Sequence, residues 1–340
     1  MERIIELRSD TFTKPGPGML EAMQLAVIGD DVFGEDQATN ELQEYCAALF
    51  GYEAALFCTS GTMANQIAIH CWTKPGDELI CDALSHIYLY EGGGIAANSG
   101  VSVHLLQGNL GRINASQVGE AVKQDNPHFP KSGLVSLENT VNKGGGSCYD
   151  IEEIKKIKEV CIKYRIPLHL DGARLFNAML ATGTEPKAYG KLFDSISVCL
   201  SKGLGAPMGS ILLGSREFIH QAIRVRKRWG GGWRQSGYMA AAGLYALKNQ
   251  VSRLKEDHWH ARSIAEVLKT RPEVCSLLPV QTNIVIFYID ESWGDSSAWV
   301  KFAAQNGILC APFGRNAVRM VTHLDFTPED FLQFELKMKS

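Results

Sequence analysis

The sequence predicts an α/β domain with a mostly parallel sheet, followed by a smaller C-terminal α+β domain. Short apolar runs alternate with longer amphipathic runs as far as about Arg234, and the pattern changes after that residue. The composition agrees, because 45% of the 340 residues are hydrophobic and 21% are charged, which is typical of folded globular proteins. A chain of this length can bury one large core and a second, smaller one.

Seven short apolar runs predict the buried strands of the first sheet: 54–58, 78–81, 101–106, 133–137, 167–170, 195–199 and 210–213. Amphipathic patterns between most of these runs predict helices, among them 62–71, 115–123, 151–164 and 173–180. Strands that alternate with helices in this way are typical of a parallel sheet covered by helices.

The last third of the chain has a different pattern of apolar and polar residues. One long helical pattern runs from 236 to about 269, followed by a strand at 283–289, a helix at 297–305, a strand at 317–321 and a final helix. The first residues have no clear period and contain Pro15 and Pro17, so we expect an arm that other parts of the chain hold in place. The expected organisation is an arm of residues 1–18, a large domain of 19–245 and a small domain of 246–340.

Charge and cysteine usage exclude several classes of function. The formal net charge of −3 predicts no general attraction to nucleic acid or to an anionic membrane. No apolar stretch has the length of a membrane span, and the charged start lacks a secretion signal, so we expect a cytoplasmic protein. The nine cysteines form no CxxC pair and lie beside no histidines at zinc spacing, which predicts reduced thiols and no metal site.

Ligands of open parallel sheets bind at the carboxyl ends of the strands, so the residues that follow each apolar run are candidates for a site. After the first run, Thr59-Ser60-Gly61-Thr62 opens a helix whose free N–H groups could bind a phosphate. A simple capping turn would look the same. The sequence contains no GxxxxGK[ST] and no complete GxGxxG, which disfavours P-loop and dinucleotide-binding proteins.

Two further strand ends carry charged residues. Asp171 closes one buried strand and could cap the next helix or hold a cationic ring nitrogen, with Arg174 placed to bind a carboxylate. Lys202 follows another strand beside a serine and two glycines. It is either an ordinary loop lysine or a half-buried amine of lowered pKa that forms a Schiff base with a carbonyl.

Taken together, these residues suit pyridoxal 5′-phosphate, which needs a phosphate anchor, a partner for its pyridine nitrogen and an amine. The cofactor also needs a residue that stacks on its ring. His86 could supply that contact, or it could be a loop histidine with no such role.

Seven ordered stretches of the sequence resemble one known family: Leu7-Arg8-Ser9-Asp10-Thr11, Gly29-Asp30-Asp31-Val32-Phe33-Gly34, Ser60-Gly61-Thr62-Met63, Leu137-Glu138-Asn139-Thr140, Asp171-Gly172-Ala173-Arg174, Leu200-Ser201-Lys202-Gly203-Leu204 and Arg319-Met320-Val321-Thr322-His323. The family is that of the low-specificity L-threonine aldolases, pyridoxal-phosphate enzymes of fold type I. The resemblance extends over nearly the whole chain.

This resemblance implies a role for each cofactor contact: Lys202 carries the cofactor, Asp171 pairs with the ring nitrogen, His86 stacks on the ring, and Gly61, Thr62, Arg234 and Lys227 bind the phosphate, Lys227 from a neighbouring subunit. Shared sites imply a homo-oligomer, a dimer at least, and the resemblance suggests a tetramer.

The resemblance also assigns the substrate, a small β-hydroxy amino acid. Ser9, Arg174 and Arg319 would clamp its carboxylate, and His128 would reach its hydroxyl across the subunit interface. The implied reaction breaks the Cα–Cβ bond of threonine to give glycine and acetaldehyde, with His86 or His128 as the base.

Two residues depart from the family pattern. Val141 stands where histidine is usual, and Phe33 stands where tyrosine is more common, so both leave the substrate preference open. The same residues could also serve an amino-acid racemase, a β-eliminating lyase or a transaminase. A non-catalytic cofactor carrier or a nucleotide-binding module is disfavoured, because neither needs a carboxylate clamp.

Overall fold

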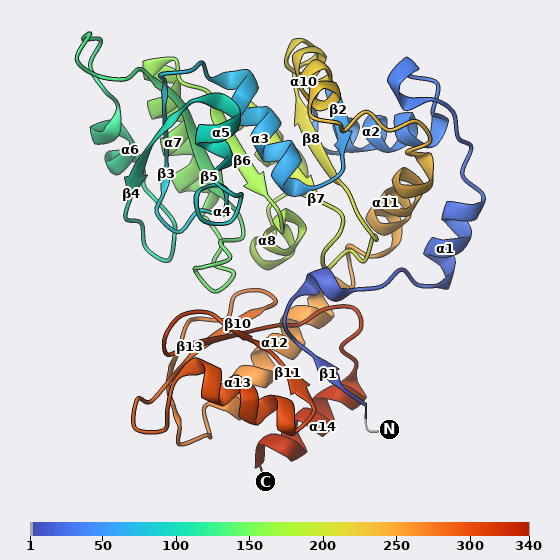
Figure 1. The fold of residues 1–340 in the computed structure, drawn as a ribbon, viewed down its shortest axis with the longest axis vertical. Coiled ribbons are helices and arrows are strands. Elements are labelled where there is room, and N and C mark those ends of the chain that lie inside the picture. The colour runs from blue at the N-terminus through green and yellow to red at the C-terminus, as the bar shows by residue number, and fades with distance from the viewer. Residues whose placement is uncertain (1–2, 340) are drawn as a thin grey trace.

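The computed structural model describes residues 3–339 and contains a large sheet with helices on both faces and a smaller sheet beside it (Figure 1). The large sheet has seven strands in the order β2-β8-β7-β6-β5-β3-β4. Their bounds are β2 (Ala54–Cys58), β3 (Glu78–Asp82), β4 (Ser102–Leu106), β5 (Ser132–Glu138), β6 (Leu168–Gly172), β7 (Ser195–Cys199) and β8 (Ser210–Gly214). The predicted α/β fold with a mostly parallel sheet is confirmed.

Strand β8 is the antiparallel member of this sheet, and it pairs in that sense with both β2 and β7. The cause is the connection from β7, which spans residues 200–209 and contains no helix. A parallel return needs a crossover of about a dozen residues or more, usually with a helix. This short connection carries Lys202 along the carboxyl end of the sheet.

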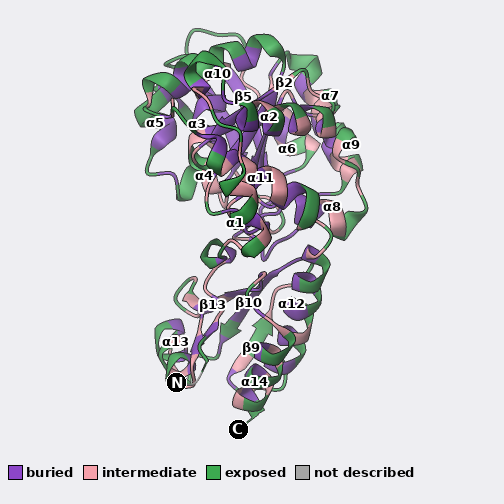
Figure 2. Ribbon diagram, turned by 90° about the vertical axis from the view of Figure 1, so that its right-hand side faces the viewer, coloured by how far each residue is buried: buried purple, intermediate pink, exposed green. Residues whose placement is uncertain are grey.

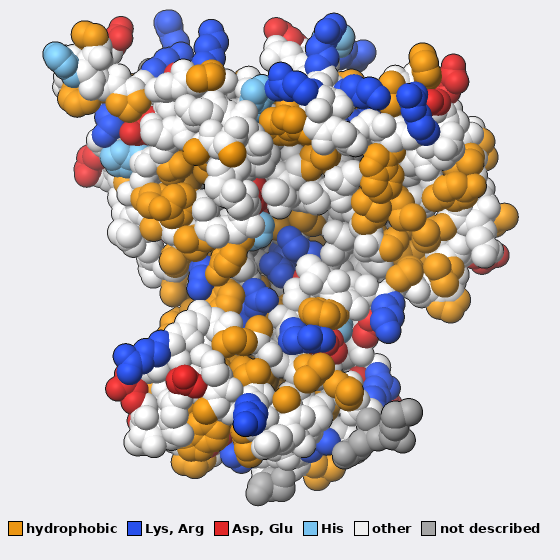
Figure 3. Space-filling view, viewed as in Figure 1, with side chains coloured by type: hydrophobic (Ala, Val, Ile, Leu, Met, Phe, Trp, Pro, Cys, Tyr) orange, Lys and Arg blue, Asp and Glu red, His pale blue; other side chains and the backbone are white. Residues whose placement is uncertain are grey.

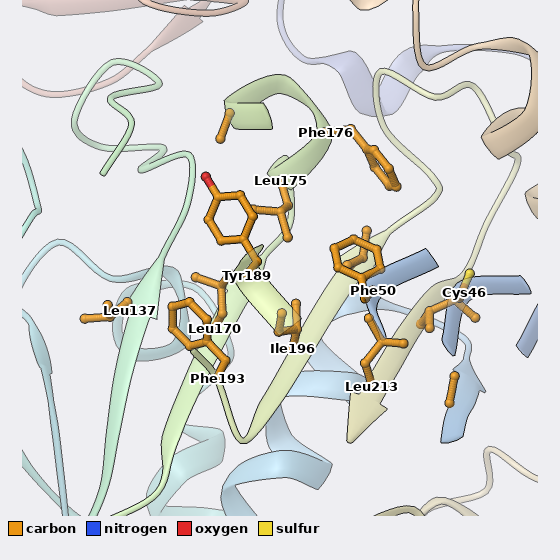
Figure 4. Close-up of a cluster of buried hydrophobic side chains, with 14 of the residues drawn as sticks. Cys46, Phe50, Leu137, Leu170, Leu175, Phe176, Tyr189, Phe193, Ile196 and Leu213 are labelled. Atoms are coloured by element: carbon orange, nitrogen blue, oxygen red, sulfur yellow. The ribbon is translucent and has the colours of Figure 1, made fainter. Parts of the chain in front are cut away.

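Helices cover both faces of the large sheet, and their apolar sides form its core. The helices of this part are α1 (Pro17–Gln24), α2 (Gln37–Phe50), α3 (Gly61–Trp72), α4 (His86–Leu89), α5 (Gly94–Ser99), α6 (Ala115–Ala121), α7 (Ile151–Tyr164), α8 (Leu175–Thr182), α9 (Pro186–Gly190), α10 (Arg216–Arg228) and α11 (Gly237–Asn249). On one face, Phe50, Phe176 and Tyr189 pack over Leu170 and Ile196 of the strands (Figure 4). The opposite face is covered mainly by α3 and α10.

The smaller sheet has the order β12-β13-β10-β9, and a separate parallel pair joins β1 to β11. The remaining elements are β1 (Ile5–Glu6), β9 (Val274–Leu277), β10 (Ile284–Ile289), β11 (Ile308–Leu309), β12 (Ala311–Pro312), β13 (Ala317–Val321), α12 (Leu254–Leu268), α13 (Ser296–Gln305) and α14 (Pro328–Lys339). The buried faces of these helices close a second apolar core with this sheet (Figure 2).

The N-terminal arm joins the two parts of the molecule. Its strand β1 pairs with β11, and the N–H of Val321 donates to the carbonyl of Leu7 at 2.8 Å. The chain then crosses to the large sheet, where α1 packs against α11 (Figure 1). The arm is therefore held at both ends.

The single long helix expected over 236–269 is wrong. The structure contains two helices, α11 and α12, separated at residues 250–253. Ala242 and Ala246 of α11 lie in the core of the large sheet, whereas Ala261 and Ile264 of α12 lie in the smaller core. The chain turns between them because the two helices bury their apolar faces in different cores. The expected division at 245/246 lies just before this turn.

Within residues 3–339, no helix combines the length and the apolarity that crossing a membrane requires.

Candidate active site

A cavity of about 390 Å³ lies between the two parts of the molecule, at the carboxyl ends of the parallel strands. Both parts and the arm contribute to its wall: Ser9, Thr11, His86, Tyr90, Asn142, Arg174, Lys202, Ala311, Pro312, Phe313 and Arg319. Lysine and arginine side chains appear in the hollow between the upper and lower parts in Figure 3. The structure thus brings together six of the residues predicted from the sequence: Ser9, His86, Arg174, Lys202 and Arg319 in this wall, and Asp171 beside His86.

Lys202 is half-buried near the start of the β7–β8 connection, three residues after β7 ends. Its Nζ lies 3.4 Å from Sγ of Cys199, and the described residues offer it no carboxylate within ion-pair distance. The hydroxyl of Thr13 in the arm donates to the Lys202 carbonyl at 3.0 Å, which fixes the backbone here. The amine is therefore held at the cavity without a carboxylate partner among the described residues.

Asp171 ends β6 and is 2% exposed. Its Oδ1 accepts a hydrogen bond from the Ala173 N–H at 3.2 Å, whereas its buried Oδ2 has no partner among the described residues. Helix α8 begins at Leu175 with Arg174 as its N-cap, so Asp171 does not cap that helix. A buried carboxylate oxygen of this kind is costly unless a cationic N–H binds it, which fits the pyridine nitrogen of pyridoxal phosphate.

Helix α3 begins at Gly61, directly after β2. The Ser60 side chain accepts a hydrogen bond from the Met63 N–H, and the N–H groups of Gly61 and Thr62 have no acceptor within the helix. A Cβ added at Gly61 would lie 2.6 Å from Sγ of Cys199, so glycine allows the helix start to approach the β7 end. The helix N-terminus suits a phosphate and lies next to the strand that precedes Lys202.

His86 opens helix α4 on the other side of the cavity. Its backbone N–H donates to Oε2 of Glu138 at 2.7 Å, and its Nδ1 lies 3.1 Å from Oε1 of Glu91. One ring nitrogen of His86 and one carboxylate oxygen each of Glu91 and Asp171 lie within 4.8 Å of one another. Burial lowers the His86 pKa, but the hydrogen bond to Glu91 and the charges of Asp171, Glu91 and Glu138 raise it above its ordinary value.

Glu138 lies beside Asp171 on the neighbouring strand, and the two residues are paired in register. Burial, and next the charge of Asp171, raise the pKa of Glu138 to about 7. The Asn142 N–H also donates to Glu138, at 2.8 Å. Glu138 therefore ties the start of α4 to the loop that carries Asn142.

The two arginines of the predicted carboxylate clamp have different environments. Arg174 is buried and forms a two-bond ion pair with Asp10, at 2.7 and 2.6 Å. Arg319 donates to Oδ1 of Asn142 at 2.7 Å and to the Arg8 carbonyl at 3.0 Å, and its buried Nε has no partner among the described residues. Burial, and then the charge of Arg174, lower the pKa of Arg319 to about 10. Arg319 is thus the clamp cation with no carboxylate partner.

Three further predicted residues, His128, Lys227 and Arg234, lie on the surface of this chain and do not line the cavity. His128 is in an exposed loop between α6 and β5, and Lys227 is exposed on α10. Arg234 is half-exposed and pairs with Asp30 at 2.9 Å. Their assignment to a site shared with another subunit stays a prediction. Of the two departures from the family pattern, Val141 is buried and Phe33 is 73% exposed.

Sequence reasoning missed four residues of the site: Asp10, Glu91, Glu138 and Asn142. Three of them lie within, or close to, stretches that were recognised, but their roles depend on partners elsewhere in the chain. For Glu91, the sequence contained one indication of a role at the site: its carboxylate lies five positions after His86.

The fold and the cavity define a class of protein, the amino-acid enzymes that use pyridoxal phosphate. Lys202 and Arg319 line one cavity, the buried carboxylate of Asp171 lies beside His86 in its wall, and the N-terminus of helix α3 adjoins the strand that precedes Lys202. Comparison with known proteins identifies the family. Residues 6–292 match the model of the Beta-eliminating lyase family, and the chain belongs to this family.

Individual relatives agree with this assignment. The chain is 41% identical over 333 residues to the low specificity L-threonine aldolase of Escherichia coli K12, covering 97% of both chains. It is 38% identical over 335 residues to low-specificity L-threonine aldolase 1 of Arabidopsis thaliana, covering 96% of this chain and 93% of the relative.

Solved structures show the same fold. A threonine aldolase of Leishmania major matches with a TM-score of 0.84 and 19% identity over 98% of both chains. At this level of identity, the likeness is evidence for the fold alone.

Proposed function

We propose that this chain is a pyridoxal-phosphate-dependent aldolase that cleaves L-threonine, L-allo-threonine and related β-hydroxy-α-amino acids to glycine and an aldehyde. The observation that carries the proposal is the buried Oδ2 of Asp171, which has no partner among the described residues and lies beside His86 at the cavity where Lys202 has no carboxylate partner. The names of the curated relatives support the same activity.

Each cofactor contact has a candidate residue in this chain. Lys202 would bind the cofactor covalently, Asp171 would keep its ring nitrogen protonated, and His86 would stack on the ring. The N–H groups of Gly61 and Thr62 would hold the phosphate. When bound, pyridoxal phosphate supplies an electron sink for the pair released from a bond at Cα.

Residues of this chain orient the Cα–Cβ bond for cleavage and accept the proton of the β-hydroxyl group. Arg319 binds the substrate carboxylate as the unpaired cation, and Ser9 and Arg174 complete the clamp. Fixing the carboxylate orients the Cα–Cβ bond for cleavage. A base then accepts the proton of the β-hydroxyl group, either His86 in this cavity or His128 from a neighbouring subunit.

The proposed assembly is a homo-oligomer, at least a dimer and by resemblance a tetramer. Apolar side chains remain exposed along the segment after α1, including Leu25, Val27, Val32 and Phe33. We propose that a second copy covers this face and that Arg234, Lys227 and His128 belong to a site shared between subunits. We place the protein in the cytoplasm and propose roles in threonine breakdown and glycine formation, with no nucleic acid or membrane as partner.

A coupled assay tests the activity. The protein, supplied with pyridoxal phosphate, is incubated with L-threonine or L-allo-threonine, and acetaldehyde is measured with alcohol dehydrogenase and NADH. We expect aldehyde from at least one substrate and none from the Lys202→Ala variant. Cofactor binding without aldehyde would refute the aldolase and favour a racemase or a β-eliminating lyase. Failure to bind the cofactor would refute the entire proposal.

A further inference from the structure

Glu91 is a buried carboxylate that the proposed chemistry does not yet use. Its side chain is fully buried. Oε1 accepts a hydrogen bond from Nδ2 of Asn65 at 2.9 Å, and Oε2 accepts one from Nε2 of Gln66 at 2.6 Å. Oε1 also lies 3.1 Å from Nδ1 of His86. Each oxygen of Glu91 thus accepts a hydrogen bond from a side-chain amide.

The direction of these bonds is fixed by a buried network behind Glu91. The Asn65 oxygen accepts from the Ser197 hydroxyl at 2.5 Å and lies 3.1 Å from Nε2 of His169. Burial lowers the pKa of His169 to about 4, so this histidine is neutral and carries one ring proton. Its Nδ1 is occupied by the Ser195 hydroxyl at 2.8 Å. Because its oxygen is engaged in this way, Asn65 presents its NH₂ group to Glu91.

We propose that Glu91 is the positioning residue of His86: it holds the proton on Nδ1 and leaves Nε2 as the acceptor available in the cavity. The reason is that both carboxylate oxygens of Glu91 already act as hydrogen-bond acceptors toward amides, so the ring nitrogen beside Oε1 is placed to donate to it. A neutral imidazole with its proton on Nδ1 has its lone pair on Nε2. This inference rests on the proposed function, and it favours His86 over His128 as the base.

The proton transfer balances with these groups. The β-hydroxyl proton moves to Nε2 of His86, and the hydroxyl oxygen becomes the aldehyde carbonyl as the Cα–Cβ bond breaks and its electron pair stays with Cα. The resulting imidazolium carries its charge next to Glu91, which stabilises it as the carboxylate of a catalytic triad does. Glu91 itself touches no substrate.

Other charged groups also act on His86. Asp171 of β6 and Glu138 of β5 raise its pKa together with Glu91, and burial opposes them. Lys202, Arg174 and Arg319 line the same cavity, and the Tyr90 ring lies 5.6 Å from the imidazole. A test must therefore remove the Glu91 charge alone and leave these groups in place.

Glu91→Gln makes this change with little difference in shape, and Glu91→Asp keeps the charge on a shorter side chain. Glu273→Gln is a matched control, because Glu273 is also buried and bonds Arg271 and Trp299 far from the cavity. The first readout needs no turnover. Deuterium exchange at the imidazole C2 of His86, followed by mass spectrometry across pH in the apoenzyme, reports the His86 pKa. We expect this pKa to fall in Glu91→Gln, to stay raised in Glu91→Asp and to be unchanged in Glu273→Gln.

The second readout uses the enzyme loaded with pyridoxal phosphate. We expect Glu91→Gln to keep the absorption band of bound cofactor and to lose about 10²-fold or more in kcat for L-threonine, the scale of general-base catalysis. The acidic limb of its pH profile should move to lower pH, and Glu91→Asp should recover part of the rate. An unchanged His86 pKa in Glu91→Gln, or an unchanged rate and profile, would overturn the inference. If the native enzyme cleaves no β-hydroxy amino acid, the proposed function fails, whereas the exchange experiment still tests the Glu91–His86 pairing.

Discussion

The close approach of helix α3 to strand β7 gives a quantitative test of the phosphate site. A Cβ at Gly61 would lie 2.6 Å from Sγ of Cys199, a distance at which one of the two groups must move. Gly61→Ala should therefore shift the start of α3 and the N–H groups offered to the phosphate. Overpacking of this kind costs about 1–3 kcal/mol. If this strain falls on the bound state, it corresponds to an increase of about 5- to 150-fold in the dissociation constant of pyridoxal phosphate.

The assay is a titration of the apoenzyme with pyridoxal phosphate, followed by the absorbance of the bound cofactor. Removal of the sulfur should relieve the strain, so Gly61→Ala in a Cys199→Ala background should weaken binding much less than Gly61→Ala alone. The Cys199→Ala variant is the reference for this comparison, because Sγ also contacts Lys202. Thermal unfolding checks that each variant is folded. An equal loss of affinity in both backgrounds would refute the steric reasoning.

Three other predictions concern the carboxylate clamp and the shared site. Arg319→Gln should raise KM for the amino acid by about 10- to 150-fold, because a hydrogen bond to a charged group contributes about 1.5–3 kcal/mol. The affinity for pyridoxal phosphate, measured by the same absorbance titration, should stay unchanged. Burial raises the pKa of Asp10, but the ion pair with Arg174 outweighs burial and lowers this pKa to about 2. The ionised Asp10 carboxylate therefore stabilises the fold above pH 4, and this stabilisation is lost as the pH falls toward 2. Urea unfolding should show this loss, and Asp10→Asn should remove it while destabilising the protein, by about 3–5 kcal/mol if Arg174 is left buried and unpaired. If His128 acts across an interface, mixing inactive His128→Ala and Lys202→Ala subunits should restore activity, and no recovery would assign His128 to another role.

The strands of the large sheet could be predicted almost to the residue because most of them are buried on both faces. Such strands are continuous apolar runs between polar connections, and the predicted run 54–58 coincides with β2. The break between α11 and α12 left no such signal. Both helices are amphipathic and their apolar positions run on in phase, so the turn at 250–253 depends on which core each helix covers.

The candidate site shows the same limit. Asp171 and Lys202 could be predicted because topology places the residues after parallel strands at one edge of the sheet. The difference between Arg174 and Arg319 could not, because it depends on Asp10, which is 164 positions from Arg174 in the sequence. The pairing of Glu91 with Asn65 likewise joins residues that only the fold brings together.

The arm explains why, within residues 3–339, one of the two predicted clamp arginines has a carboxylate partner and the other has none. Asp10 reaches Arg174 from the arm and neutralises it, while the carbonyl of Arg8, also in the arm, fixes Arg319. Under the proposed function, the substrate carboxylate would bind Arg319 of the smaller part, while the amine of Lys202 belongs to the large sheet. Under the proposed function, the orientation of the substrate, and so the bond at Cα that breaks, would depend on how the arm joins these two parts.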